Sequence, residues 1–140
     1  MLDLDRFKDY NDVYGHLPGD EALRRVAAAC AAQLRPGDRF YRFGGEEFLV
    51  LATDLEVVDA VELAERLRRT VAGLRITHVR NRPWRVLTLS GGVAGIDADA
   101  VGIEEWVGPA DAALYAAKGA GRNRVEQART PTQSGGPGSG

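Results

Sequence analysis

The chain has 140 residues and a formal net charge of −2, and its 44% hydrophobic and 27% charged residues indicate one folded globular domain, not a disordered chain. The slight negative charge argues against a protein that grips a nucleic-acid backbone, and the single cysteine, Cys30, excludes a disulfide framework and a cysteine metal site. No apolar run approaches the roughly 20 residues that span a bilayer, so we expect a cytoplasmic chain that makes no membrane contact.

The first half of the chain predicts a strand, a helix and a β-hairpin. The strand ends within residues 1–5, and the helix begins near Asp20, whose charge suits the positive end of a helix dipole. Pro36-Gly37 ends that helix. Two β-rich runs between 40 and 52 then flank Gly44-Gly45-Glu46-Glu47, which predicts a hairpin with an acidic tip.

The second half predicts a further helix, more strands and a final helix. Thr53 followed by Glu56 is the pattern of a capping box, and apolar residues at helical spacing extend the next helix to Leu74. The remaining predicted elements are two strands around a turn at 81–83, a helix from 103 to the glycines at 119 and 121, and an edge strand at 124–126.

This order of elements predicts an α+β fold, with a ferredoxin-like antiparallel sheet and helices packed on one of its faces. Residues 1–128 would form the domain. Residues 129–140 are rich in glycine, serine and proline, which is typical of a flexible tail, either a linker or an engineered remnant. Gly91-Gly92 predicts that another backbone approaches the sheet closely.

Acidic residues gather at one end of the predicted sheet. Asp3 and Asp5 alternate with Leu4, so both carboxylates point to one side, and ferredoxin-like pairing would set Glu46 and Glu47 beside them. Crowded carboxylates raise one another's pKa unless a cation lies among them, and all-oxygen ligands favour a hard ion such as magnesium. Two such ions would suit phosphoryl transfer on a nucleotide. A solvated strand end and a solvated turn remain the alternative interpretation.

Basic residues that could bind phosphate stand in two places. Arg6, Phe7 and Lys8 follow the first strand, where backbone N–H groups and the Lys8 ammonium could hold phosphates. Lys118 and Arg122 stand at the end of the last predicted helix. Cations there also complement the negative end of the helix dipole, so capping and phosphate binding both remain open for this pair.

Four segments resemble those of the GGDEF family, in its order and at about its spacing: DLDRFKDYNDVYGHLPGD, RFGGEEF, LTLSGGVA and ADAALYAAKGAGRN. GGEEF is a common variant of the family's name motif, and the resemblance runs from Met1 to about Val125. It implies a palm-like fold of the nucleotidyl-cyclase type. It also implies a diguanylate cyclase of bacterial signalling, which condenses two GTP molecules into cyclic di-GMP and releases two pyrophosphates.

The resemblance implies a role for each matching residue. Magnesium, or manganese in its place, would be held by Asp3, the main-chain carbonyl of Leu4, Glu46 and Glu47, and Glu46 would also be catalytic by helping to deprotonate the ribose 3′-hydroxyl. Guanine would be read by Asn11 and Asp20. The triphosphate would be held by Arg6, Phe7, Lys8, Gly44, Gly45, Lys118 and Arg122. Because each domain would hold one GTP, two copies would have to face each other as a homodimer.

Arg35 and Asp38 match the family's R-x-x-D inhibitory site, with Arg66 as its second arginine. The resemblance implies that cyclic di-GMP binds there as a product inhibitor, and arginine can both stack on guanine and hydrogen-bond to it. Taken alone, Arg35-Pro36-Gly37-Asp38 is typical of a turn in which the aspartate caps locally.

The sequence departs from the family at its start. The family normally has a preceding segment with a D-x-L-T-G-L-x-N-R-like motif, so we expect an N-terminally truncated domain that serves as the output of a larger sensor. Two rival functions stay open: a non-catalytic cyclic di-GMP receptor, and a protein interaction module. His16 and His78 lack a spacing that suggests zinc, and we interpret His78 as a surface residue.

Overall fold

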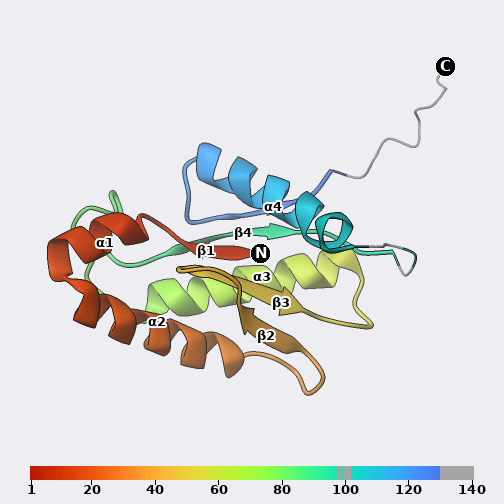
Figure 1. Ribbon diagram of the computed structural model, residues 1–140, viewed down its shortest axis with the longest axis horizontal. Coiled ribbons are helices and arrows are strands. Elements are labelled where there is room, and N and C mark those ends of the chain that lie inside the picture. Colours follow the sequence, from red (N-terminus) through yellow and green to blue (C-terminus); the bar gives the residue numbers. More distant parts are fainter. Residues whose placement is uncertain (98, 100–101, 130–140) are drawn as a thin grey trace.

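The computed structural model describes residues 1–97, 99 and 102–129, and Figure 1 shows their arrangement. The elements in chain order are β1 (Leu2–Leu4), α1 (Phe7–Tyr14), α2 (His16–Ala31), β2 (Arg39–Arg42), β3 (Glu47–Leu51), α3 (Val57–Gly73), β4 (Leu89–Val93), α4 (Ile103–Gly119) and β5 (Val125–Gln127). The predicted tail at 129–140 lies outside the described residues, apart from Arg129. No helix in the described part is long and apolar enough to cross a membrane.

The strands form one sheet in the order β2-β3-β1-β4-β5. β1 lies at its centre, antiparallel to β3 and β4, whereas β4 and β5 run parallel. The predicted α+β fold is confirmed, but the edge pair makes the sheet mixed and not wholly antiparallel. A parallel neighbour requires a crossover connection, and α4 supplies it between β4 and β5.

Helices cover both faces of this sheet, so the prediction of one covered face is wrong. α1, α2 and α3 share a core cluster with the strands that includes Leu4 and Leu67. α4 lies over the opposite face, where Leu114 packs near Met1, and Figure 1 draws α4 across the strands from α2 and α3. The pleat of β1 explains this division, because it sends Leu4 to one face and its neighbour Asp3 to the other.

The close approach of α4 depends on Gly92. A Cβ at this position would lie 2.1 Å from the carbonyl oxygen of Ala110 and 2.3 Å from the backbone nitrogen of Leu114. The predicted close backbone approach is therefore confirmed at Gly92, since no side chain fits there. The tight contact lets α4 run across β4 and end beside the central strand.

The segment after β1 contains two helices where the sequence predicts one. α1 is stabilised by Phe7 and Tyr10, both buried, whose rings stack with 5.6 Å between centroids. Gly15, with φ 95, ends α1 and precedes α2 at once, so α2 begins at His16 and not near Asp20. The polar residues of α1 have low helix propensity, so the aromatic packing outweighs the local preference.

Two later predictions are also corrected. Glu56 is the N-cap residue of α3, and none of the side chains that the structure describes caps that helix through a hydrogen bond, so Thr53 and Glu56 form no capping box. The predicted strand pair before residue 96 reduces to β4 and an isolated bridge between Thr77 and Val86. The side-chain Nδ2 of Asn81 donates to the Val86 carbonyl at 2.8 Å. This bond closes the segment into a loop, so the bridge is not extended into a longer ladder.

Candidate functional site

The acidic residues of β1 and the hairpin lie side by side near the end of the sheet. Asp3 stands opposite Glu47 in the antiparallel register of β1 and β3, and the Leu4 amide donates to the Glu46 carbonyl at 3.2 Å. The predicted pairing of the hairpin with the first strand is thus confirmed. Directly opposed residues have Cβ atoms roughly 5 Å apart, so one cation could contact both carboxylates.

Asp3 is buried and bonded to a lysine from α4. The Lys118 ammonium donates to Asp3 Oδ2 at 2.9 Å. Burial raises the pKa of Asp3 and the charges of Glu47 and Asp5 raise it further, while the hydrogen bond and charge of Lys118 oppose the increase. The crowding of carboxylates that the sequence predicts is therefore present, and a lysine partly relieves it.

The carboxylate oxygens of Asp3 and Glu47 are ligands of the kind that a hard cation prefers, although two carboxylates do not make a complete ligand set. Within the described residues, no group of three or more His, Cys, Asp or Glu side chains is arranged to hold a metal ion. Asp3 and Glu47 can share a cation, and Leu4 ends β1 beside them. Lys118 supplies the positive charge in this conformation, so an ion would take the place of its ammonium at Asp3.

Asp5 has a different role from Asp3, although both point to the same side of β1. Ser90 Oγ donates to its Oδ1 at 2.7 Å, and Thr88 Oγ1 and the Asn123 amide donate to its Oδ2 at 2.7 and 3.0 Å. Asp5 is 1% exposed, so these bonds tie β1 to β4 and to the loop after α4. The signal for this network is the T-x-S spacing where the chain enters β4, which puts Thr88 and Ser90 on one face.

The start of α1 follows directly at the end of β1. Arg6 is the N-cap residue, with φ 52 and ψ 41 in the left-handed region, and no described side chain caps the helix through a hydrogen bond. The first N–H groups of a helix have no partner inside it, and together with the dipole they favour anions. Lys8 is exposed, and Arg6 contacts Asp9 only at 3.8 Å. This segment can therefore face a phosphate.

The end of α4 reaches the same region. Lys118 contacts Asp3 as described, and the N–H of half-buried Arg122 donates to the Ala117 carbonyl at 3.0 Å, with φ 68 at Arg122. The next residue is Asn123, whose amide binds Asp5. The structure thus brings the Lys118 ammonium and the backbone of Arg122 to the end of β1, where α1 begins.

The predicted guanine-reading residues lie on α1 and α2. Asn11 packs against Gly19, where an added Cβ would lie 1.9 Å from Asn11 Oδ1, and this oxygen is buried with no hydrogen-bond partner among the described residues. Asp20 is exposed and lines a cavity of about 510 Å³ between α2 and the hairpin, which Phe40 and Arg42 also line. An orphaned acceptor at this depth is costly unless a ligand satisfies it.

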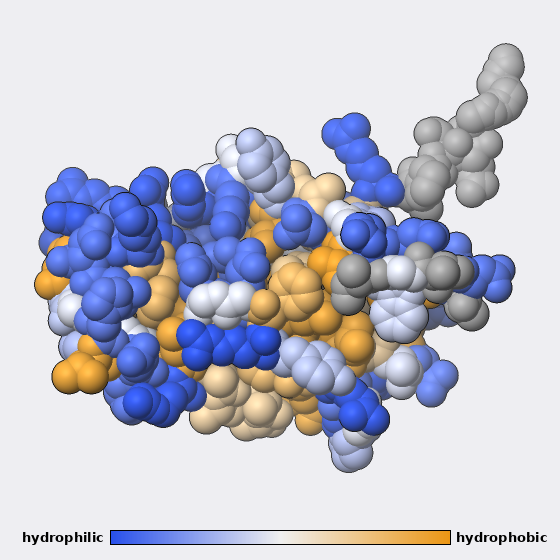
Figure 2. Space-filling model, in the orientation of Figure 1, coloured by the Kyte–Doolittle hydropathy of each residue, from blue (hydrophilic) through white to orange (hydrophobic). Residues whose placement is uncertain are grey.

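The hairpin tip is held by an arginine that the sequence analysis does not single out. Arg42 donates to the Gly45 carbonyl at 2.6 Å and more weakly to the Gly44 carbonyl at 3.3 Å. A Cβ at Gly44 would meet Glu47 Oε1 at 2.9 Å, whereas a Cβ at Gly45 would have no described atom within 4 Å. Figure 2 shows hydrophobic residues in the middle of this face, where Figure 1 draws β1 and the hairpin, between more hydrophilic ends.

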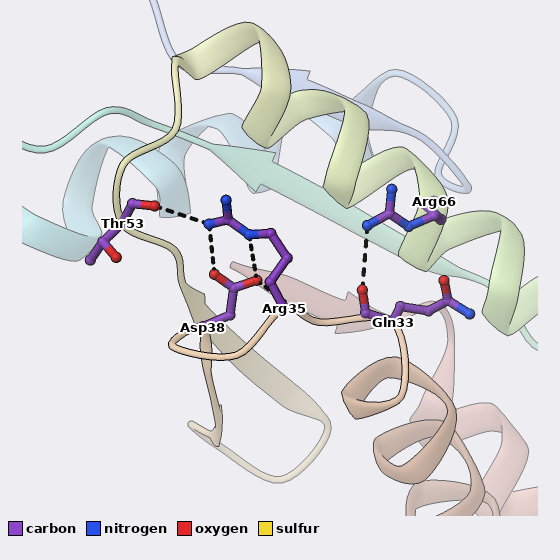
Figure 3. A network of polar contacts seen from close by, with 5 residues as sticks. All are labelled: Gln33, Arg35, Asp38, Thr53 and Arg66. Carbon is purple, nitrogen blue, oxygen red and sulfur yellow. Dashed lines mark hydrogen bonds and ion pairs between the residues drawn. The ribbon is translucent and has the colours of Figure 1, made fainter.

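Arg35 and Asp38 form a closed turn before β2. Arg35 donates to Asp38 through its Nε at 3.2 Å, its Nη2 at 2.9 Å and its backbone amide at 2.8 Å, and Nη2 also reaches the Thr53 carbonyl at 2.9 Å (Figure 3). The side-chain and backbone hydrogen bonds from Arg35 lower the pKa of Asp38, because they favour the charged carboxylate. The local capping interpretation is correct for this turn, and it also orients the arginine.

Arg66 reaches the same neighbourhood from α3. Its Nη2 donates to the Gln33 carbonyl at 3.3 Å, and Figure 3 shows both guanidinium groups on the same side of the chain around residues 33–35. Arg35 and Arg66 are exposed. Two guanidinium groups, one of them fixed by a carboxylate, make a surface that a planar or anionic ligand could meet.

Comparison with known proteins agrees with this geometry. The sequence profile described as "Diguanylate cyclase, GGDEF domain" matches residues 1–124. Response regulator PleD of Caulobacter vibrioides is 39% identical over 125 residues, and diguanylate cyclase VdcA of Vibrio cholerae is 41% identical over 127. Each match covers 89% of this chain but only 28% and 37% of those relatives, so the chain spans well under half of their length.

Solved structures show the same fold. The GGDEF domain of DgcB from Caulobacter crescentus, in complex with c-di-GMP, superposes with a TM-score of 0.80 at 34% identity and covers 92% of this chain and 73% of that one. The active GGEEF domain of a diguanylate cyclase from Vibrio cholerae gives 0.74 at 32% identity, covering 93% and 81%. From its profile match, its relatives and its sheet of palm type, this chain belongs to the GGDEF family of diguanylate cyclase domains.

Proposed function

We propose that this domain condenses two GTP molecules into cyclic di-GMP. The observation that carries the proposal is the pairing of Asp3 with Glu47 at the point where the start of α1 and Lys118 of α4 also meet. Two carboxylates, orphan helix N–H groups and a lysine at one place suit a nucleoside triphosphate with its metal. The family's relatives named diguanylate cyclase support the same reaction.

The metal ligands would be Asp3, the Leu4 carbonyl, Glu46 and Glu47. Bound magnesium, or manganese in its place, would neutralise charge on the triphosphate and favour ionisation of the attacking hydroxyl. Lys118 would exchange its contact with Asp3 for a phosphate oxygen, because the ion then supplies the positive charge that Asp3 needs. Arg122, Lys8 and the backbone at Arg6 and Phe7 would hold the remaining phosphate oxygens.

Guanine would be read by Asn11 and Asp20. The unpartnered Asn11 oxygen can accept a hydrogen bond from a base N–H, and the Asp20 carboxylate offers two more acceptors. Guanine presents donors at N1 and N2, which adenine lacks at the same positions, so these acceptors would favour GTP over ATP. Gly44 and Gly45 would let the hairpin backbone approach the α-phosphate.

The reaction would require two copies of the chain. The 3′-oxygen of the GTP held by one copy would attack the α-phosphorus of the GTP held by the other copy. Glu46 would help to remove the hydroxyl proton, and pyrophosphate would leave. Two attacks close the ring and release two pyrophosphates. Positioning supplies much of such a rate enhancement, so a homodimer in which the two sites face each other would be the active form.

Arg35, Asp38 and Arg66 would bind the product and inhibit the enzyme. The turn already fixes Arg35 against Asp38, and Arg66 lies beside it, so little ordering is left for the ligand to cause. The structure of DgcB in complex with c-di-GMP belongs to a relative with the same fold.

The test is to incubate the purified chain with GTP and magnesium and to measure cyclic di-GMP by chromatography and mass. We expect Glu46→Gln to lower the rate about 100-fold or more, because loss of a metal ligand and base removes transition-state stabilisation. Glu62→Gln, an exposed change on α3, serves as the matched control and should form product normally. Equal rates for the wild-type chain and Glu46→Gln would contradict the proposed catalytic role.

A non-catalytic cyclic di-GMP receptor is the second candidate. The supporting observation is that the Arg35–Asp38 turn is already formed. By contrast, Lys118 is paired with Asp3, and the described residues contain no group of three or more side chains that could hold a metal ion. Tight binding of cyclic di-GMP with no turnover of GTP would favour this candidate over the cyclase.

A further inference from the structure

A buried histidine contacts the first residue of the segment proposed to bind phosphate. His78 is 0% exposed, so its interpretation as a surface residue is wrong. Its Nε2 lies 2.9 Å from the carbonyl oxygen of Arg6, although the two residues are 72 positions apart. The same carbonyl accepts the first helical hydrogen bond of α1, from the Tyr10 amide at 3.0 Å. His78 therefore acts on the point where β1 turns into α1.

The chemistry of this contact defines the state of the ring. A carbonyl oxygen only accepts, so Nε2 of His78 carries the hydrogen and donates it. Nδ1 is buried with no partner among the described residues, and burial lowers the pKa of His78, so the ring is neutral. Tyr10 meets the ring edge-on, with 5.3 Å between centroids, and fixes its orientation. His78 is thus a rigid single donor aimed at one carbonyl.

A fixed Arg6 carbonyl also fixes an N–H group. The peptide bond between Arg6 and Phe7 is planar and trans, so its N–H points opposite to its C=O. Arg6 has a left-handed backbone, φ 52 and ψ 41, which is uncommon for a residue with a side chain. A bond that holds the carbonyl toward the protein interior therefore holds the Phe7 N–H away from it, on the side where phosphate is proposed to bind.

The loop that carries His78 supports the same segment at further points. The Val79 amide donates to the Tyr14 hydroxyl at 3.0 Å, at the other end of α1. The side-chain Nδ2 of Asn81 donates to Thr88 Oγ1 at 2.8 Å, and the Thr88 hydroxyl donates to Asp5. The loop thus contacts both ends of α1 and, through Thr88, the residue before Arg6.

We propose that His78 is a positioning residue for GTP: its Nε2–H aligns the Arg6–Phe7 peptide so that the Phe7 N–H meets the β- or γ-phosphate. The inference rests on the proposed function, because it assumes that the start of α1 binds the triphosphate. It adds a residue that touches neither the nucleotide nor the metal and acts through the backbone.

The test compares binding of two nucleotides by calorimetry in magnesium: GMP, and the α,β-methylene analogue of GTP, whose α–β bridge the reaction cannot break. The readout is the ratio of the two dissociation constants. His78→Met fills the space but donates no hydrogen bond, and we expect it to weaken the analogue about tenfold while changing GMP less than about threefold. His78→Gln places an amide donor near the Nε2 position and should keep the wild-type ratio.

Tyr14→Phe is the matched control, because it removes the bond between the same loop and the other end of α1. We expect it to lower the melting temperature without changing the ratio. An unchanged ratio in His78→Met, or an equal change in Tyr14→Phe, would overturn the inference. If His78→Met does not fold, His78→Asn replaces it, since its amide reaches only the Nδ1 position; equal ratios for Asn and Gln would overturn the inference as well.

Failure of the proposed function has a separate signature. A wild-type chain that binds GMP and the analogue equally has no site for the terminal phosphates, and the role of His78 is then overturned together with that site. A wild-type chain that prefers the analogue, with the same preference in His78→Met, leaves the proposed function standing and rejects only the role of His78.

Discussion

Two hydrogen-bonded aspartates, Asp5 and Asp38, belong to regions that are built in opposite ways. Asp5 is enclosed between strands and accepts from Thr88, Ser90 and Asn123, which lie 83 to 118 positions further along the chain. Among the described residues, Asp38 accepts from Arg35 alone, three positions before it, in a turn at the surface. One region exists only when the whole domain is folded, whereas the other can form almost by itself.

Long-range bonds fix the geometry of the first region, and short-range bonds fix that of the second. The region around Asp5 joins β1, β4 and the end of α4, and so sets the relative positions of Asp3, Lys118 and the start of α1. Buried networks of this kind are rigid when satisfied and costly when broken. The Arg35–Asp38 turn is closed by its own short-range bonds, so it can present its arginine to a ligand without help from the sheet.

The largest effect is expected from Asp5→Asn. The amide keeps the size of the side chain but turns at least one buried donor toward another donor, so we expect the free energy of unfolding to fall by about 3 kcal/mol. Urea unfolding followed by circular dichroism measures it. Asp9→Asn is the control, because Asp9 is half-buried and its ion pairs within the described part of the chain are long, at 3.8 and 4.0 Å. Similar losses of unfolding free energy in both variants would show that the hydrogen bonds of Asp5 do not contribute more than those of an ordinary carboxylate.

A smaller effect is expected from Lys118→Met, which removes the cation beside Asp3. Lys118 is one-third exposed, so we expect a loss of about 1–2 kcal/mol in unfolding free energy near neutral pH, less than for a fully buried pair. Magnesium should restore more stability to this variant than to the wild-type chain, because the ion can replace the ammonium at Asp3. Lys8→Met, at an exposed lysine, is the control.

The same variant has a defined pH dependence. Burial raises the folded-state pKa of Asp3 above 3.8, and removing Lys118 takes away what opposes this increase. The folded state then binds the proton more readily than the unfolded state, so stability falls as pH rises through the window above 3.8. The deficit of Lys118→Met should thus be small near about pH 4 and larger near about pH 7. A deficit independent of pH would mean that the lysine does not act through Asp3.

The contrast between the two regions also explains what could be predicted from the sequence. The turn at Arg35 can be read from four adjacent residues. The pairing of Asp3 with Glu47 follows from the expected order of strands in a ferredoxin-like sheet, combined with the period of two along each strand. The buried state of His78 cannot, because its partner Arg6 is 72 positions away.

α1 illustrates the same limit in secondary structure. Its residues Asp9, Asn11 and Asp12 are poor helix formers, and the helix exists because Phe7 and Tyr10 are buried by other elements. The left-handed Arg6 that precedes it has no sequence signal either, since glycine is the residue expected in that conformation. Tertiary contacts therefore shape the segment that is proposed to bind phosphate.

The smallest effect on stability is expected from Arg35→Ala, and it separates the two regions most sharply. The arginine is exposed and its partners lie on the surface turn or at Thr53, so the unfolding transition should stay close to that of the wild-type chain. Binding of cyclic di-GMP should nevertheless weaken about tenfold or more, because a guanidinium oriented by a carboxylate is lost from the proposed site. Calorimetric titration measures this, with Arg39→Ala, next to the turn on β2, as the control. If Arg35→Ala destabilised the domain as much as Asp5→Asn, the turn would be needed for the stability of the fold. If both arginine variants bound cyclic di-GMP like the wild-type chain, the ligand would have to bind at another surface.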